Sequence, residues 1–127
     1  MVSVNALMKK DPVIVDIGTS VIEAAQLMKA CNVESVLVAL RGHVIGLVTE
    51  TDIVRNFVAS DKASYFLSVK DVMSHPALGI DKRGSLAEAA DLMLQHRTFQ
   101  LAVTNSGSLI GVISAWDFLR SMAFRRH

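Results

Sequence analysis

Two heptapeptides in this chain combine a glycine, a hydroxyl and a carboxylate at the same spacing. Residues 46–52 read Gly-Leu-Val-Thr-Glu-Thr-Asp, and residues 111–117 read Gly-Val-Ile-Ser-Ala-Trp-Asp. If a helix begins at each hydroxyl residue, its first backbone N–H groups lack intrahelical partners and suit a phosphate. An Asp one turn later can accept two hydrogen bonds from a ribose diol, and the glycine lets a ligand approach the strand closely. The pattern is compatible with a nucleotide site.

The same residues are also typical of an ordinary helix start. Thr49 or Ser114 can serve as the N-cap, with Asp52 or Asp117 in the first turn. One residue can fill both roles when no ligand is bound. Each Asp is followed three positions later by an arginine that could pair with it or reach a phosphate, namely Arg55 and Arg120.

The chain is an internal duplication. When residues 4–55 are shifted forward by 65 positions, fifteen residues coincide without a gap. A chain built from two copies of one unit tends toward pseudo-twofold symmetry, with matching clefts between the copies. We therefore expect function where the copies meet.

Each copy reads as strand, helix, strand, strand, helix. Ser20 with Glu23, and Ser85 with Glu88, form capping boxes ahead of apolar residues at helical spacing. Paired apolar runs follow at 36–40 with 44–48 and at 101–104 with 109–113, each pair separated by a glycine-containing turn, which predicts a hairpin. The last helix of each copy then begins at Thr49 or Ser114. We expect its inner face to carry the apolar residues Ile53, Val54, Phe57 and Val58 in one copy and Phe118, Leu119 and Met122 in the other.

These patterns predict an α/β (α+β) fold of tandem βαββα repeats, with small mixed sheets packed against helices. The first repeat covers residues 1–58, the connection covers 59–68, and the second repeat covers 69–127. We expect Tyr65, Phe66 and Leu67 to anchor part of the connection to the core.

Composition restricts the classes of function. A net charge of +1 argues against nucleic-acid binding, and the apolar runs are too short to span a membrane. The first residues lack the features of a secretory signal, and a lone Cys31 cannot form an internal disulfide, so we expect a cytoplasmic protein. The apolar fraction of 51% is high for a small soluble monomer and favours a homo-oligomer.

No residues point to a metal, a cofactor or catalysis. The four histidines are scattered, with no partner at helical spacing. The chain also lacks a nucleophile elbow and a glycine-rich phosphate loop. We therefore expect a protein that is not an enzyme and holds no metal.

The duplicated heptapeptide in a βαββα unit resembles the cystathionine-β-synthase-type (CBS) domain pair, or Bateman module. The likeness covers nearly the whole chain, including the two lead-ins from Met8 to Pro12 and from Met73 to Pro76. The resemblance implies a stand-alone regulatory module that binds AMP, ADP or ATP, with S-adenosylmethionine less favoured, between its two copies. It also implies a homodimer formed through the CBS helices and an unidentified partner protein that the module regulates.

The resemblance further implies that each cleft takes its hydroxyl and Asp from one copy and its base-side wall from the other. One cleft would join Ser114 and Asp117 to Ile14, Val15, Val36 and Leu37; the other would join Thr49 and Asp52 to Gly79, Ile80, Leu101 and Ala102. Gly79 and Trp116 depart from the common pattern, so we expect unequal sites, with the Asp117 cleft slightly favoured. The alternative is a structural dimerisation module, a scaffold whose clefts are vestigial.

Overall fold

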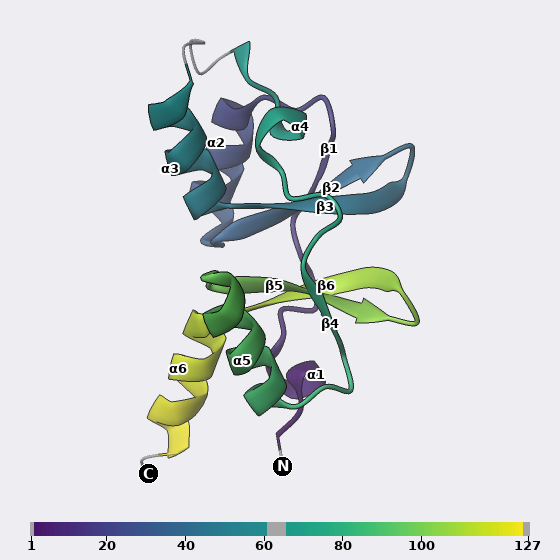
Figure 1. The fold of residues 1–127 in the computed structure, drawn as a ribbon, viewed down its shortest axis with the longest axis vertical. Coiled ribbons are helices and arrows are strands. Elements are labelled where there is room, and N and C mark those ends of the chain that lie inside the picture. Colours follow the sequence, from purple (N-terminus) through teal and green to yellow (C-terminus); the bar gives the residue numbers. More distant parts are fainter. Residues whose placement is uncertain (1, 61–65, 126–127) are drawn as a thin grey trace. The chain divides into compact units, whose positions relative to one another are not determined.

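The computed structural model describes residues 2–60 and 66–125, which fold as two compact units. Residues 13–78 form one, here called the middle unit. Residues 1–12 and 79–127 form the other, here called the terminal unit because it holds both ends of the chain. Each unit has a mixed three-stranded sheet and helices, which confirms the predicted α+β architecture of two βαββα repeats (Figure 1).

The middle unit contains a sheet of order β1-β2-β3. Its strands are β1 (Ile14–Asp16), β2 (Ser35–Leu40) and β3 (His43–Thr49), and its helices are α2 (Val21–Cys31), α3 (Glu50–Ala59) and the short α4 (Val69–Val72). Strand β1 pairs parallel with β2, and β2 pairs antiparallel with β3. Figure 1 shows the three helices gathered on one face of this sheet.

The terminal unit repeats this plan in a sheet of order β4-β5-β6. Its strands are β4 (Gly79–Asp81), β5 (Gln100–Asn105) and β6 (Ser108–Ser114), and its helices are α1 (Val4–Leu7), α5 (Leu86–His96) and α6 (Ala115–Arg125). The pairings of β4 with β5 and of β5 with β6 match those of the middle unit, including a register shift at the equivalent position.

Local sequence signals set the turns and most helix starts. Each hairpin turns through two residues of positive φ, Arg41-Gly42 or Ser106-Gly107, as expected for the tight turns that join antiparallel strands. The Ser85 hydroxyl accepts the Glu88 N–H and the Glu88 carboxylate accepts the Ser85 N–H, a complete capping box. Ser20 caps α2 through the Glu23 N–H, but the reciprocal bond is not made in the described part of the chain.

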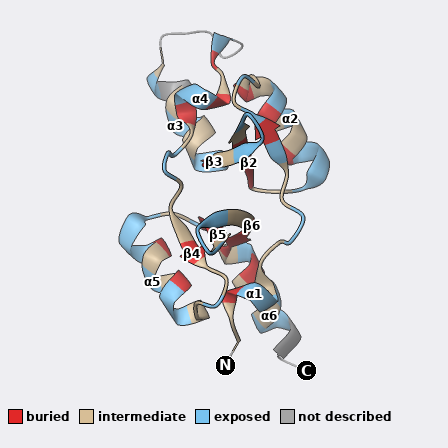
Figure 2. Cartoon of the chain, turned by 90° about the vertical axis from the view of Figure 1, so that its right-hand side faces the viewer, coloured by how far each residue is buried: buried red, intermediate tan, exposed pale blue. Residues whose placement is uncertain are grey.

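The cores lie between sheet and helices. In the middle unit one buried cluster joins strand residues Val15, Val36, Val38 and Val48 to helix residues Val21, Ala24 and Met28 and to Leu67, Val69 and Val72. Figure 2 shows the buried residues, in red, on strands and helices of both units. Leu67 anchors the end of the connection as expected, whereas Phe66 is exposed and Tyr65 lies outside the described residues.

The folded units differ from the sequence repeats at their beginnings. The segment that leads into the first repeat packs in the terminal unit. The N–H groups of Val4 and Asn5 donate to the carbonyls of Gly84 and Lys82. Lys9 forms an isolated antiparallel β-bridge with Val112. The segment that leads into the second repeat packs in the middle unit. There it forms two isolated antiparallel β-bridges, Ser68 with Ser20 and Ser74 with Leu47. We call residues 2–12 and 66–78 the lead segments. Each unit is therefore completed by the lead segment of the other repeat.

Not every apolar helix residue faces inward, and this corrects one expectation. Val54 on α3 is 61% exposed, and Leu119 and Met122 on α6 are 52% and 62% exposed. The side chains of Phe57 and Val58 lie outside the described residues. Among the described helices, none combines the length and apolar character that a membrane span requires.

Candidate functional site

In the middle unit, the predicted hydroxyl and carboxylate meet where β3 passes into α3. The Asp52 N–H donates to Thr49 Oγ1 at 3.1 Å, and the Thr49 N–H donates to Asp52 Oδ2 at 2.9 Å. This is a complete capping box, so the helix-start interpretation of these residues is confirmed. It does not exclude a second role, because the box uses only one carboxylate oxygen.

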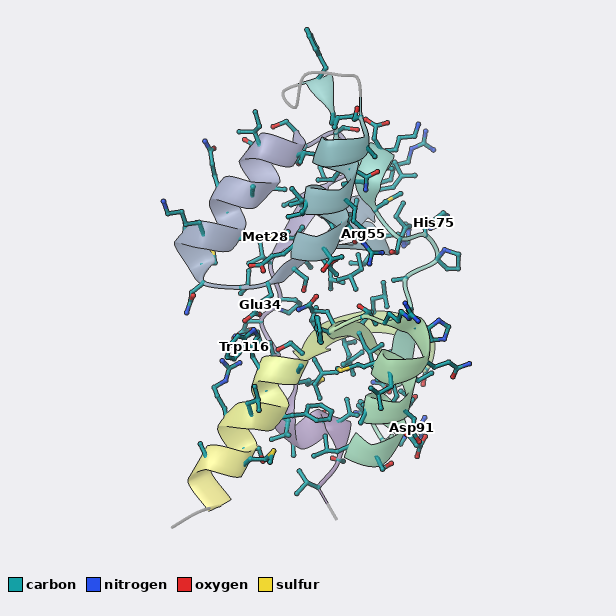
Figure 3. The ribbon with its side chains drawn as sticks, turned by 60° about the vertical axis from the view of Figure 1, so that its left-hand side comes forward. Met28, Glu34, Arg55, His75, Asp91 and Trp116 are labelled. Carbon is teal, nitrogen blue, oxygen red and sulfur yellow. The ribbon has the colours of Figure 1, made fainter. Side chains whose placement is uncertain are left out.

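The other Asp52 oxygen, Oδ1, has no protein partner among the described residues. Arg55, one turn further along α3, is exposed, and among the described residues it makes no ion pair with Asp52. Figure 3 shows where Arg55 projects from the helix. The middle unit therefore presents a half-buried carboxylate that keeps acceptor capacity for a further donor.

The terminal unit builds the same turn between β6 and α6. The Ser114 N–H donates to Asp117 Oδ2 at 2.8 Å, and the Asp117 N–H donates to Ser114 Oγ at 3.4 Å. The Ser114 hydroxyl also lies 3.3 Å from Oδ2. Both residues are buried, with Asp117 only 7% exposed.

Here the second carboxylate oxygen is occupied. Arg120 Nη2 lies 2.6 Å from Asp117 Oδ1, in an ion pair whose Arg side chain is 51% exposed and whose Asp side chain is 6% exposed. Of the two roles that the sequence left open for Arg120, the structure has the pairing role. The two repeats thus carry the same Asp-x-x-Arg letters in different states, one unpaired and one closed.

The motif glycines have a structural reason that the sequence interpretation missed. A Cβ on Gly111 would lie 2.7 Å from the Lys9 carbonyl oxygen, and one on Gly46 would lie 2.8 Å from Met73 Sδ and 3.0 Å from the Ser74 carbonyl oxygen. Such approaches are too close for a side chain. The close neighbour of each motif glycine is therefore the lead segment packed in the same unit. The close approach of a ligand to these glycines stays a prediction.

The predicted base-side residues of the middle unit divide between two faces of the sheet. Ile14 and Leu37 are register partners on adjacent strands, so they share one face. Val15 and Val36 belong to the core cluster on the helix side. Ile14 is 51% exposed, which leaves a large aliphatic side chain available at the end of β1. The side chains of Val15 and Val36 are therefore taken up by the core, and Val36 has no exposed surface.

The equivalent positions of the terminal unit are small. Gly79 and Ala102 are the register partners that correspond to Ile14 and Leu37. A Cβ on Gly79 would meet the Ala102 carbonyl oxygen at 3.3 Å and Thr104 Cγ2 at 3.4 Å, so neighbouring atoms crowd the place of a side chain. Ile80 and Leu101 are buried, like Val15 and Val36. The terminal unit therefore lacks the aliphatic pair that the middle unit has.

Two further observations limit the chemistry. Trp116, within the second motif, exposes 54% of its surface at the start of α6 (Figure 3). Across the described residues, no group of three or more His, Cys, Asp or Glu side chains is arranged to hold a metal ion. The arrangement offers hydrogen-bond acceptors, hydroxyls and apolar side chains, which are groups suited to binding.

Comparison with known proteins agrees with this geometry. The CBS domain model matches residues 4–59 and 69–123. The CBS domain-containing protein YhcV of Bacillus subtilis is 30% identical over 117 residues, which cover 92% of this chain and 83% of that protein. Homoserine O-acetyltransferase of Methanosphaera stadtmanae is 33% identical over 108 residues, but these cover 80% of this chain and only 21% of the enzyme. The chain also spans less than two thirds of two uncharacterized archaeal relatives.

Solved structures share the fold. A Pyrococcus horikoshii protein superimposes with a TM-score of 0.88 at 26% identity, covering 94% of this chain and 91% of that one. A hexameric CBS-CP12 protein from bloom-forming cyanobacteria gives a TM-score of 0.86 at 26% identity, over 99% of this chain and 74% of that one. The CBS domain pair of MJ0100, solved with 5′-methylthioadenosine and S-adenosyl-L-methionine, gives 0.82 at 17% identity, over 95% and 99%.

Two matched repeats, a shared strand–helix turn and a relative matched over 83% of its length lead to one conclusion. The chain belongs to the CBS domain family and is a CBS domain pair, a regulatory module.

Proposed function

We propose that this chain senses adenine nucleotides, AMP, ADP or ATP, with residues drawn from both repeats, and transmits their occupancy to a partner protein. The observation that supports it most is the Asp52 carboxylate, which caps α3 with one oxygen and keeps the other without a protein partner among the described residues. A ribose diol supplies the two donors that such a carboxylate accepts. We assign the chain no catalytic role, since relatives that are named as enzymes match over only 21%, 12% and 11% of their own lengths.

The remaining contacts follow from chemistry. The hydroxyls of Thr49 and Ser114 and the second N–H groups of α3 and α6, those of Thr51 and Trp116, suit phosphate oxygens. The first N–H group of each helix already donates to a carbonyl, that of Glu34 or Phe99. The exposed aliphatic side chain of Ile14 suits one face of a purine. Of the two proposed sites, the first combines Ile14 and Leu37 with Asp117, which is paired with Arg120. The second combines the small Gly79 and Ala102 with Asp52, which has a free oxygen among the described residues.

A thermal-shift panel tests the proposal. A ligand at one hundred times its dissociation constant adds about 2.7 kcal/mol, or about 10 °C of melting temperature for a domain of this size. The panel contains AMP, ADP, ATP and, because MJ0100 was solved with them, S-adenosylmethionine and 5′-methylthioadenosine. GMP is the matched control for the base. If no adenine compound moves the melting temperature at millimolar concentration, the proposal fails.

Calorimetric titration of variants tests the residue assignment. Asp52→Asn and Asp117→Asn preserve side-chain size but remove the charge and replace one acceptor oxygen with an NH2 donor. Each should therefore remove the binding that depends on its own carboxylate. Asp91→Asn is the matched control, because Asp91 is an exposed residue on α5 (Figure 3). Unchanged binding in both test variants would contradict the assignment of Asp52 and Asp117.

A second candidate is the structural one, a homodimeric scaffold. It is favoured by an apolar stripe on α6, formed by Trp116, Leu119 and Met122 at helical spacing and more than half exposed in each case. Sedimentation velocity should show a dimer that Leu119→Glu dissociates, with Arg120→Gln as the control on the same helix. A dimer that forms without any response to adenine compounds would favour the scaffold, and a monomer at micromolar concentration would contradict it.

A further inference from the structure

The Asp117–Arg120 ion pair occupies the atoms that a ribose would need. Asp117 Oδ2 accepts the Ser114 N–H and lies beside its hydroxyl, and Oδ1 is held by Arg120 at 2.6 Å. The carboxylate offers about four acceptor sites and three are in use, so a ribose diol that brings two donors must displace the guanidinium from Oδ1. The equivalent Asp52 imposes no such requirement, because Arg55 is not paired with it among the described residues.

We infer that Arg120 makes the Asp117 site selective for phosphorylated ligands. The inference rests on the proposed function and concerns one of its two sites. Arg120 lies one turn beyond Asp117 on α6, and its side chain is half exposed while the Asp side chain is buried, so the arginine is the partner that can leave. A phosphate near the start of α6 offers the displaced guanidinium a new anion. An adenosine offers none.

The two ligand types therefore differ in what displacement costs. An adenine nucleotide exchanges the Arg–Asp pair for an Arg–phosphate pair, so the guanidinium keeps an anionic partner throughout. An uncharged nucleoside leaves the guanidinium with water alone. A half-exposed ion pair contributes at most about a factor of five in an equilibrium constant, so we expect a preference of about fivefold from this exchange.

Calorimetric titration with AMP and adenosine tests the inference on the full chain. Asp52→Asn is introduced first, so that the binding measured is that which uses Asp117. In this background, Arg120→Gln should strengthen adenosine binding about fivefold and leave AMP binding nearly unchanged, because AMP no longer breaks the Arg–Asp pair and no longer gains the Arg–phosphate pair. Stronger binding of the nucleoside is not expected from a merely structural role, whose loss would weaken both ligands.

Arg83→Gln is the matched control. It removes the same charge in the same unit and breaks another Arg–Asp pair, that of Arg83 with Asp81, which is exposed. It should leave the AMP-to-adenosine ratio unchanged. Arg120→Lys is the second variant, to be used if Arg120→Gln does not fold. Lysine keeps the charge without the planar fork, so it should reduce the ratio by less and in the same direction.

Each outcome decides a different claim. An unchanged ratio in the folded Arg120 variants, or equal weakening of both ligands, overturns the inference and leaves the proposed function intact. The same conclusion follows if the parent binds ligand and Asp52→Asn abolishes that binding completely, because the Asp117 site then takes no ligand. A parent that binds neither AMP nor adenosine overturns the proposed function and the inference with it.

Discussion

The Asp that follows each strand–helix junction is held differently in the two units. Asp52 gives one oxygen to its capping box and is half-buried, whereas Asp117 is buried, gives one oxygen to the same box and the other to Arg120. The apolar positions differ as well, with Ile14 and Leu37 in one unit and Gly79 and Ala102 in the other. Equal folds have therefore produced unequal surroundings for one motif, which is how a duplicated module can acquire two distinct sites.

The largest effects should come from the motif glycines. Gly111→Ala should destabilise the protein by about 2–3 kcal/mol, because its Cβ would lie 2.7 Å from a backbone oxygen of the lead segment. Gly46→Ala should cost less, since its nearest neighbour is Sδ of the flexible Met73 side chain and its backbone contact, with the Ser74 carbonyl oxygen, is longer at 3.0 Å. Urea denaturation followed by circular dichroism measures both. Gly18→Ala is the control, because its Cβ would meet only a carboxylate oxygen at 3.4 Å.

The next largest losses of stability should come from replacing the two carboxylates, and these losses should differ between the units. Asp117→Ala should cost about 2 kcal/mol, because it leaves the buried Ser114 N–H without its acceptor. Asp52→Ala should cost about 1 kcal/mol, the ordinary value of a helix cap in a half-buried position. The exposed Asp91→Ala should remain within about 0.5 kcal/mol in the same urea series. If the two variants lost equal free energy of unfolding, the two carboxylates would not differ in their contribution to stability.

The arginines should differ by less. Arg120→Gln should reduce the free energy of unfolding by up to about 1 kcal/mol, since it removes a half-exposed ion pair, and the loss should shrink in high salt. Arg55→Gln removes no described ion pair and should stay within about 0.5 kcal/mol. A salt-dependent loss as large at Arg55 as at Arg120 would show that both repeats form the pair in solution.

The smallest effect concerns the end of β4. Arg83 donates to Asp81 and lowers the pKa of that carboxyl from the ordinary 3.8 to about 2, while Gly18 occupies the position equivalent to Arg83 in the middle unit. Because the folded pKa is depressed, the associated stability is present above pH 4 and is lost as the pH falls through about 2. A carbon-13 NMR titration should show the Asp81 pKa rising toward its ordinary value in Arg83→Gln. An unchanged midpoint would mean that Arg83 does not hold the carboxylate in solution.

Much of the fold was predictable from short-range patterns. The hairpins follow from turns at Gly42 and Gly107, and the capped helices follow from Ser20 and Ser85, because these signals act over a few residues. The hydroxyl–carboxylate turns at Thr49 and Ser114 were likewise predictable, together with their capping role. The ligand role of the same residues remains a prediction.

The lead segments were not predictable in the same way. Lys9 bridges Val112 and Ser74 bridges Leu47, although the local sequence around each gives no sign of its partner. These long-range pairings also explain Gly46 and Gly111, whose close neighbours come from distant parts of the chain. A pattern of residue types at fixed spacing carries no information about such contacts.

The sequence by itself determined the duplication, the βαββα order within each repeat, and the place of each Asp one turn into a helix. All of these depend on local spacing and on the capping preferences of a few side chains. The short helices α1 and α4, which precede the two repeats' first strands, were not predicted. Only the tertiary structure decided that Asp117 is buried and paired with Arg120, while Asp52 keeps a free oxygen among the described residues. Both copies spell Asp-x-x-Arg, so the difference arises from the packing around them, which places the same letters in different surroundings.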